Sequence, residues 1–400
     1  MRSAPLALTV VLAIGLAACG GDDDDDASTD TASTEPASTE PASTEPVPTD
    51  TASTETAATD GSSAGSFPED RCAQNQEAGT ITFLTGFDFA AAASIVDVIV
   101  ADEAGYYDEL CLDVELRPSF STANYPLIAE NQAQFASGGS FSEVVQFAAA
   151  NDADFQVVSV EGRTPIDVLI TKPGAIASLD ELAGTTIGVK GKLPSSVAVM
   201  LLEAGLVEGT DYDTVLLDGF DPSAHIAIDA IVGFPGWKSN EPGQLERAGI
   251  AFDTFDPADD GIPGSFGAIY TSAEFVAEHP TAAEDFVRAT MRGLADAVAD
   301  PVAAADTAVE LINANGNPNF LSPEGEVFRW ETEAALIEET TPAGVPLAMP
   351  VVEDLQVELD AYAAIGLFGE GAAAPDAADF VDTTLIDAVY GDDGVVIWPS

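Results

Sequence analysis

The chain has 400 residues, with 12 Lys and Arg against 69 Asp and Glu, which gives a formal net charge of −57 at pH 7. So large a negative charge repels polyanions, and it argues against nucleic acid and anionic lipid head groups as binding partners. Apolar residues make up 46% of the chain, so a large core is available. The length suits a tail followed by one two-lobed protein or two small domains.

The first residues predict an export signal. Arg2 precedes an apolar run from Leu6 to Leu16, which is too short for a membrane span and is typical of a signal peptide over residues 1–18. The run ends in Leu-Ala-Ala-Cys, which is similar to the lipobox of bacterial lipoproteins. That resemblance implies that Cys19 is diacylated and becomes the mature N-terminus. The alternative is a chance cysteine after an ordinary signal peptide.

Residues 19–66 are predicted to be a disordered tether. Five consecutive acids, Asp22–Asp26, precede three Ala-Ser-Thr-Glu-Pro repeats at Ala32–Pro46. Such a composition cannot bury a core. We interpret the Asp run as a solvated spacer rather than as a calcium site.

Ile81–Leu116 is typical of a strand-helix-strand unit. An apolar run from Ile81 predicts a strand, Asp88 is expected to cap a helix from Phe89 to about Gly105, and the alternation at Leu112–Leu116 predicts a second strand. Such a unit gives a parallel sheet, whose ligands lie beyond the carboxyl ends of the strands.

Two cysteines remain after the leader. Cys72 comes just before the first predicted strand and Cys111 just before the second. Adjacent parallel strands bring these positions close, so in an exported protein we expect a disulfide. The alternative is a pair of buried thiols.

Two glycine-containing loops follow predicted strands. After Ala133–Ala136, the run Ser137–Glu143 contains two glycines, and Ser140 or Ser142 is expected to cap the next helix, whose free N–H groups suit a carboxylate, a phosphate or a ring carbonyl. After Thr186–Val189, the loop Lys190–Ser196 lacks the spacing of a nucleotide-binding P-loop.

Lysines are rare and clustered. Of the four in the chain, Lys190, Lys192 and Lys238 fall in two loops that we expect at strand ends in one lobe. We therefore expect them to serve a polar or anionic group of a ligand, or to hold the two lobes together.

The last third of the chain is predicted to be mostly helical. Ser272 is expected to cap a helix to Glu278, and Thr281 with Glu284 a capping box that opens a long helix. Further helices are predicted at Val302–Ala314, Pro323–Glu339, Val351–Ile365 and Asp376–Val389, and we interpret Arg329, Trp330 and Trp398 as packing residues.

Three segments resemble a known family. The runs ADEAGYYDELCLDVEL (101–116), LAGTTIGV (182–189) and FPGWKSNEP (234–242) are similar to segments of periplasmic-type solute-binding proteins of ABC importers, in the branch that binds thiamine-pyrimidine precursors and riboflavin. The resemblance runs from about Thr80 to Gly391. It implies an α/β, two-lobed periplasmic-binding-protein (type II) fold, with mainly parallel sheets and C-terminal helices on the first lobe.

The resemblance also implies a division of the chain. The first lobe would span residues 67–165, the second lobe 166–265, and the return to the first lobe with the C-terminal helices 266–400. The implied function is a lipid-anchored receptor on the outer face of the cytoplasmic membrane. It would work as a monomer with an ABC permease, close by a hinge, and need no cofactor.

A small flat heterocycle such as a thiamine-pyrimidine or riboflavin-type compound is the ligand that the aromatic loops favour, because aromatic side chains stack on rings. The lysines favour the alternative, a small anion such as an alkylsulfonate. The candidate ligand-binding residues are Phe87, Asp88, Phe89, Asp97, Phe120, Gly139, Ser140, Phe141, Glu143, Thr164, Lys190, Lys192, Phe234, Trp237, Lys238, Asn240 and Glu241.

Catalysis has few candidate residues. His225 and His279 are the two histidines, and neither has a Cys or His nearby at metal-ligand spacing. The enzyme alternative is a pyridoxal-phosphate-dependent pyrimidine synthase on the same fold. Members of that branch carry a Cys-rich motif and a histidine in the early helix region, where this chain has Ser94. We expect a binding protein, and a surface lipoprotein without an importer is a third possibility.

Overall fold

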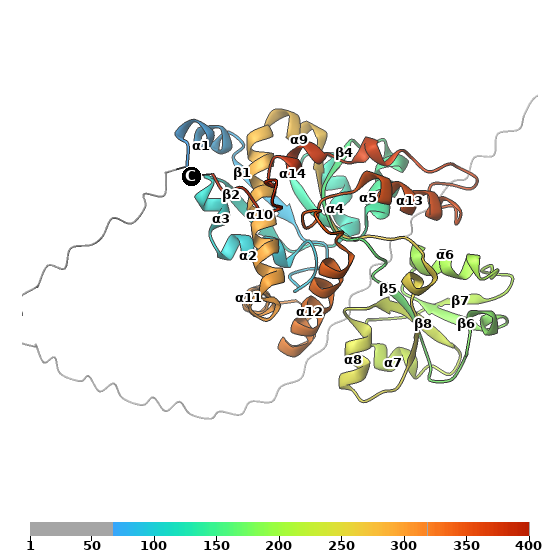
Figure 1. The fold of residues 1–400 in the computed structure, drawn as a ribbon. Coiled ribbons are helices and arrows are strands. Elements are labelled where there is room, and N and C mark those ends of the chain that lie inside the picture. Colours follow the sequence, from blue (N-terminus) through green and yellow to red (C-terminus); the bar gives the residue numbers. More distant parts are fainter. Residues whose placement is uncertain (1–66, 318, 400) are drawn as a thin grey trace, which may run out of the picture. The chain divides into compact units, whose positions relative to one another are not determined.

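The computed structural model describes residues 67–317 and 319–399, and these lie in one compact unit (Figure 1). The predicted signal peptide, the lipidation site Cys19 and the predicted tether fall outside the described residues. No helix among the described residues has both the length and the apolar character that crossing a membrane requires.

The first lobe is built on a five-stranded sheet with the order β2-β1-β3-β10-β4. Parallel pairing joins β1 to β2 and to β3, whereas β10 runs antiparallel to both of its neighbours. The four other strands therefore point the same way. The strands are β1 (Thr80–Leu84), β2 (Asp113–Arg117), β3 (Phe135–Gly138), β4 (Phe155–Gly162) and β10 (Phe266–Ser272).

The second lobe repeats this plan with the strand order β7-β6-β8-β5-β9. Here β5 is the strand that runs against its neighbours β8 and β9. Strand direction in both sheets is mainly parallel, as the sequence predicts. The strands are β5 (Asp167–Thr171), β6 (Thr186–Val189), β7 (Asp213–Leu216), β8 (Gly233–Trp237) and β9 (Asp253–Phe255).

Helices flank both sheets. The second lobe carries η1 (Leu179–Leu182), α6 (Ser195–Glu203), α7 (Pro222–Ile226), α8 (Glu241–Arg247) and η2 (Pro257–Asp260). The first lobe carries α1 (Glu69–Gln76), α2 (Val96–Glu103), α3 (Tyr106–Glu109), α4 (Ser121–Ala129), α5 (Phe141–Asn151), α9 (Ala273–Glu278) and α10 (Pro280–Ala299). The chain ends in α11 (Pro301–Asn315), α12 (Pro323–Thr340), α13 (Val352–Ala363), η3 (Ala377–Phe380) and α14 (Thr383–Asp387).

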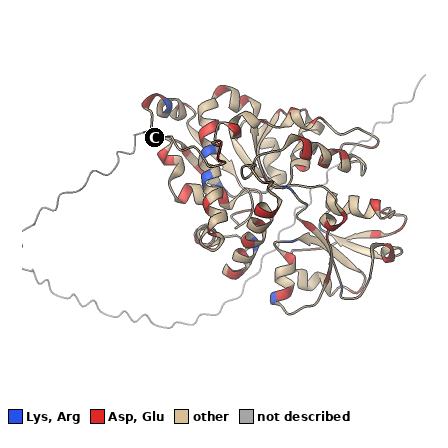
Figure 2. Cartoon of the chain, viewed as in Figure 1, with Lys and Arg blue, Asp and Glu red and all other residues tan. Residues whose placement is uncertain are grey.

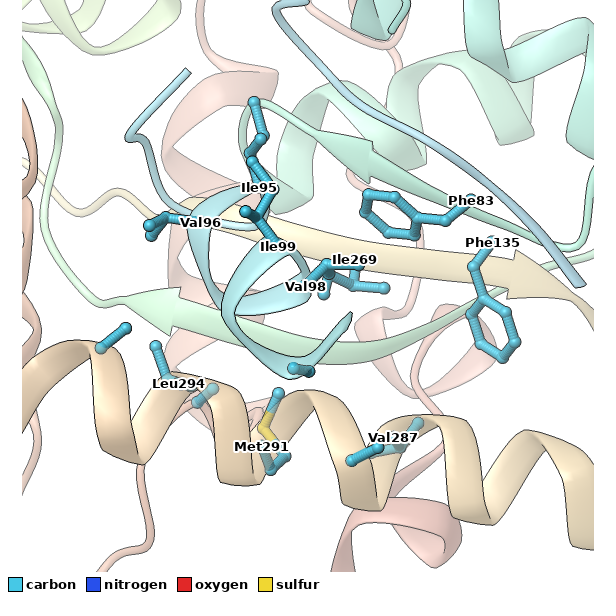
Figure 3. Close-up of a cluster of buried hydrophobic side chains, with 14 of the residues drawn as sticks. Phe83, Ile95, Val96, Val98, Ile99, Phe135, Ile269, Val287, Met291 and Leu294 are labelled. Atoms are coloured by element: carbon cyan, nitrogen blue, oxygen red, sulfur yellow. The ribbon is translucent and has the colours of Figure 1, made fainter. Parts of the chain in front are cut away.

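The largest core lies where α2 packs between the first sheet and α10. Figure 3 shows the side chains of β1, β3, β10, α2 and α10 gathered in this cluster. Gly293 makes the helix contact possible, because a Cβ there would come within 2.2 Å of the Asp97 carbonyl oxygen. A larger residue at this position would push α10 away from α2.

The N-terminal helix α1 is attached to the first lobe by a disulfide and by polar contacts. Cys72 and Cys111 are bonded, which joins α1 to the loop before β2. The Arg71 guanidinium also donates to the Asp285 carboxylate of α10 at 2.7 and 2.8 Å. These bonds fix α1 beside α10.

Three sequence predictions about helices are wrong. Asp88 caps no helix, because its φ is +47° and α2 begins only at Val96. Glu284 does not form a capping box with Thr281; instead its carboxylate bonds Arg71 and Arg288. Asp376–Val389 is two short helical turns, η3 and α14, each capped by its own Asp side chain.

The loop 87–95 stays irregular because its N–H groups bond to distant carboxylates. Ala91 N donates to Glu326 at 3.0 Å, Ala93 N to Glu333 at 2.5 Å and Ser94 N to Glu161 at 2.6 Å. These partners replace the helical hydrogen bonds that the local sequence predicts. We call this segment the 87–95 loop.

Candidate functional site

A cavity of about 350 Å³ lies between the two lobes. Its first-lobe wall follows the carboxyl ends of β1 and β3, at Gly86-Phe87 and at Gly138-Gly139. Its second-lobe wall follows the ends of β6 and β8, at Lys190 and Trp237. In sheets of mainly parallel strands, ligands bind beyond these carboxyl ends. The cavity is therefore the candidate functional site.

Both walls present aromatic rings. Phe87 and Phe120 of the first lobe meet edge to face, with ring centroids 5.8 Å apart. Trp237 and Phe220 line the second-lobe wall, and both keep part of their surface accessible, 40% and 57% respectively. Accessible rings on opposite walls can stack on a flat ligand placed between them.

About half of the sequence-predicted site residues line this cavity. The lining residues are Phe87, Phe120, Gly139, Glu143, Lys190, Lys192, Trp237, Asn240 and Glu241. The cavity wall does not include Asp88, Phe89, Asp97, Ser140, Phe141, Thr164, Phe234 or Lys238.

The three aromatic candidates that do not line the cavity belong to the apolar cores. Phe89 is 3% exposed, Phe141 is fully buried beside the first sheet, and Phe234 is fully buried in the second lobe. Phe234 and Trp237 belong to the same strand, β8, and are three residues apart, so they point to opposite faces of the sheet. Only Trp237 therefore reaches the cavity.

Two of the three clustered lysines are held within their own lobe. Lys190 Nζ pairs with Glu241 at 2.5 Å and Lys238 Nζ with Asp256 at 2.8 Å. Neither pair joins the two lobes. Lys192 lines the cavity and forms no ion pair within 4 Å among the described residues.

The start of α5, predicted as an anion site, is filled by protein groups. Ser140 caps the helix by accepting from Glu143 N at 3.3 Å. Phe141 N donates to Ser265 Oγ at 2.9 Å, and Ser142 N donates to the Glu358 carboxylate at 3.1 Å. The N–H groups that would hold an anionic ligand are already bonded.

Charged residues that sequence reasoning missed line the cavity from elsewhere. Arg329 and Glu333 come from α12, and Asp167 begins β5. Arg329 is 3% exposed and donates to Glu326 at 2.6 Å, so its head group lies beside the cavity rather than serving only as packing. The sequence does contain a signal for the two residues on α12: Glu326, Arg329 and Glu333 follow one another at helical spacing, so three charged residues share one face of the predicted helix.

Burial alters the titration of the cavity carboxyls. Burial raises the pKa of Asp167 to about 7, with the Glu143 charge adding to the effect. Burial also raises the pKa of Glu333 to about 7. The pKa of Glu143 is raised by burial, and the Lys192 charge opposes this rise. Two of the cavity carboxyl groups, Asp167 and Glu333, thus bind protons near neutral pH.

The described residues offer little for metal or histidine chemistry. They contain no group of three His, Cys, Asp or Glu side chains placed to hold a metal ion. His225 is 2% exposed, and its Nε2 lies 2.9 Å from the Asp218 carbonyl oxygen, at the edge of Phe234. It is a core residue of the second lobe.

Solved structures with a similar fold include periplasmic binding proteins. A putative sulfonate-binding SsuA of an ABC transporter from Methylobacillus flagellatus KT has a TM-score of 0.57 at 14% identity, covering 77% of this chain and 92% of that one. The nitrate-binding protein NrtA from Synechocystis PCC 6803 has a TM-score of 0.53 at 13% identity, covering 77% and 87%. At these identities the likeness concerns the fold.

Sequence comparison gives the family. The riboflavin-binding protein RibY of Chloroflexus aurantiacus is 30% identical over 194 residues, which cover 46% of this chain and 50% of that protein. The chain thus spans about half the length of the curated relative it matches. The model of the NMT1/THI5 like family matches residues 92–304, more than half of the chain, and the protein belongs to this family.

Proposed function

We propose that this protein is the extracytoplasmic solute-binding component of an ABC importer and that it captures a flat heterocycle of the thiamine-pyrimidine or riboflavin type. The observation that carries the proposal is the cavity of about 350 Å³, whose walls come from strand ends of both lobes. A site shared by two lobes couples ligand binding to closure of the lobes, which a permease can recognise.

The aromatic side chains favour a ring as the ligand. Phe87 and Phe120 would hold one face, and Trp237 and Phe220 the other. The family membership and the riboflavin-binding relative support the same ligand class. Binding here requires no chemical change of the ligand, so the protein acts as a receptor rather than as an enzyme.

A small anion such as an alkylsulfonate is the alternative. Lys192 and Arg329 in the cavity wall and the sulfonate-binding fold neighbours favour it. Four carboxyl groups also line the cavity, however, and Lys190 is already paired. Arg329 is likewise paired, with Glu326. Two of the three cations in the cavity wall are thus already neutralised among the described residues, and for that reason we prefer the heterocycle.

The leader supports a place outside the cell. The predicted signal peptide and lipobox would export the chain and anchor it through Cys19 on the outer face of the cytoplasmic membrane. Residues 19–66 would act as a spacer between the anchor and the lobes. We expect a monomer that meets its permease when the ligand is bound.

Thermal unfolding of the chain from Ser66 to Ser400 tests the ligand. The panel contains riboflavin, thiamine, its pyrimidine precursors, pyridoxal phosphate, taurine and an amino-acid mixture. A ligand at about 100 times its Kd adds about 2.7 kcal/mol to the unfolding free energy. For a chain of this size we expect Tm to rise by a few degrees with one heterocycle.

Trp237→Ala should abolish that rise, because it removes a stacking ring from the cavity wall. Leu216→Ala is the matched control, since Leu216 is 71% exposed and is not a cavity-lining residue. A rise with taurine alone would favour the anion alternative. A flat response to the whole panel would contradict the heterocycle proposal.

A further inference from the structure

One face of α12 meets both lobes at the cavity. Glu326, Arg329 and Glu333 are three and four residues apart, so they lie on the same face of the helix. All three are nearly fully buried, at 0%, 3% and 1% exposure. Three charged side chains on a buried helix face are costly unless each is bonded, so their partners explain why they are there.

Glu333 bonds one partner in each lobe. Its Oε2 accepts from Ala93 N at 2.5 Å, in the 87–95 loop of the first lobe. Its Oε1 accepts from Ser239 Oγ at 2.6 Å, in the turn between β8 and α8 of the second lobe. Ala93 and Glu333 both line the cavity. A single carboxyl group thus connects a ligand-facing loop to the opposite lobe.

Arg329 makes a second connection of the same kind. Its Nη1 donates to Glu326 Oε2 at 2.6 Å, and that oxygen also accepts from Ala91 N at 3.0 Å. Its Nη2 reaches Asn240 Oδ1 in the second lobe at 3.4 Å. The guanidinium carbon lies 5.8 Å from the centre of the Phe87 ring. The Arg329 head group therefore lies over an aromatic side chain of the cavity and bonds to groups of both lobes.

Beside these hydrogen bonds, α8 of the second lobe packs directly against α12. A Cβ on Gly243 of α8 would come within 2.3 Å of the Phe328 ring of α12. The Arg247 guanidinium lies over the same ring at 5.6 Å. The second lobe therefore fits α12 through backbone and ring contact, which holds Ser239 and Asn240 at hydrogen-bonding distance.

We propose that this face of α12 is an interlobe latch, in which Glu333 and Arg329 hold the second lobe closed and tie that closure to the 87–95 loop. A ring placed between Phe87 and Trp237 would press on the loop that carries Ala93. Ligand binding and the Ser239–Glu333 bond would then stabilise each other. The latch deepens the proposed solute-binding function and rests on it for its purpose.

The interlobe bonds suit a reversible device. When the lobes separate, the Ser239 hydroxyl and the Glu333 carboxyl each form a hydrogen bond with water in place of the bond between them. Opening therefore leaves neither group buried without a hydrogen-bond partner. The Ala93 bond lies within the first lobe and remains. Glu333 is therefore a positioning residue, since it acts on the ligand through the loop.

The test measures the distance between the lobes, without any ligand, in the full-length chain carrying C19S, so that the introduced cysteines alone take the spin labels. Spin labels at E310C on α11 and D229C in the second lobe occupy exposed positions. S239A removes the hydroxyl that Glu333 accepts from, and we expect the population at long distance to rise at least threefold by pulsed electron resonance. E333Q should act in the same direction, and S239T should restore the parent distribution.

S178A is the matched control. Ser178 lies on the second lobe, and its hydroxyl donates to Asp180 at 2.5 Å within that lobe, so the distance should not change. An unchanged distribution in S239A would overturn the latch, even if E333Q fails to fold. A panel without any Tm rise alongside opened lobes in S239A would refute the proposed ligand class and leave the latch standing. A Tm rise with one heterocycle, together with unchanged distances in S239A, would support the proposed ligand class and refute the latch.

Discussion

Two groups of acidic side chains, one in each lobe, are neutralised in different ways. In the first lobe, Asp97 and Glu161 are fully buried side by side, and neither meets a cation among the described residues. In the second lobe, Glu241 is 3% exposed but pairs with Lys190, and Asp256 pairs with Lys238. Acids are frequent on both lobes, whereas basic residues are few (Figure 2).

The difference lies in what neutralises the carboxylate charge: a bound proton in one case and a lysine side chain in the other. Burial raises the pKa of Asp97 to about 7, and burial together with the Asp97 charge raises the pKa of Glu161 well above its usual value. The Asp97–Glu161 pair is therefore neutralised by binding a proton, whereas Glu241 and Asp256 are neutralised by scarce lysines. The two groups should thus respond differently to pH and to substitution.

The largest effect should come from Asp97→Asn. An acid whose pKa is raised on folding stabilises the protein below its unfolded pKa, near 4, and this stabilisation is lost as pH rises through about 7. The variant keeps the shape without the charge, so we expect the unfolding free energy to rise by about 2–4 kcal/mol at pH 8 and much less at pH 4. Urea unfolding at the two pH values measures it.

Asp306→Asn is the control for that experiment, since Asp306 is exposed on α11 and the same chemical change there should have little effect. An Asp97→Asn variant that is destabilised equally at both pH values would show that Asp97 is held as a carboxylate. The proton-based account of the Asp97–Glu161 pair would then be wrong.

A smaller effect is expected from Lys190→Met in the second lobe. Removing the lysine leaves Glu241 buried without its cation, although Trp237 N still donates to it at 2.8 Å. Lys190 is 25% exposed, so we expect a loss of about 1–2 kcal/mol at pH 8, less than for a fully buried pair. Urea unfolding again provides the measurement.

Glu241→Gln in the Lys190→Met background should recover part of this loss, because the unpaired charge is then gone. Lys172→Met is the matched control: its Nζ donates to the Ile228 carbonyl and is in no ion pair with the described residues. Equal losses for both lysines would show that the Glu241 pair contributes nothing specific.

The parts of the fold that depend on local pattern were predictable from the sequence. Ser140 and Ser272 cap α5 and α9 as expected, and the strands β1, β2 and β6 begin and end within about a residue of their predicted bounds. Caps and strand ends depend on neighbours in sequence, which is why a single sequence contains them.

The cavity wall was harder to predict because its polar residues are placed by distant partners. The 87–95 loop is held open by Glu161, Glu326 and Glu333, which lie 67 to 240 residues away. The local apolar pattern there favoured a helix. The sequence predicts only a packing role for Arg329, because nothing in its own segment indicates that α12 reaches the second lobe.

The smallest effect on stability, and the sharpest contrast with Lys190, should come from Lys192→Ala. Lys192 is exposed to the cavity and is in no ion pair with the described residues, so its removal should change the unfolding free energy by less than about 0.5 kcal/mol.

The charge of Lys192 opposes the raised pKa of Glu143 across the cavity. Without it, Glu143 should hold its proton to higher pH. The pH dependence of the affinity for the compound that raises Tm in the panel should then shift to higher pH, which calorimetric titration over a series of pH values measures. A variant that loses stability but keeps the parent pH profile would place Lys192 with Lys190 as a structural lysine, and no lysine of the second lobe would then be reserved for the ligand.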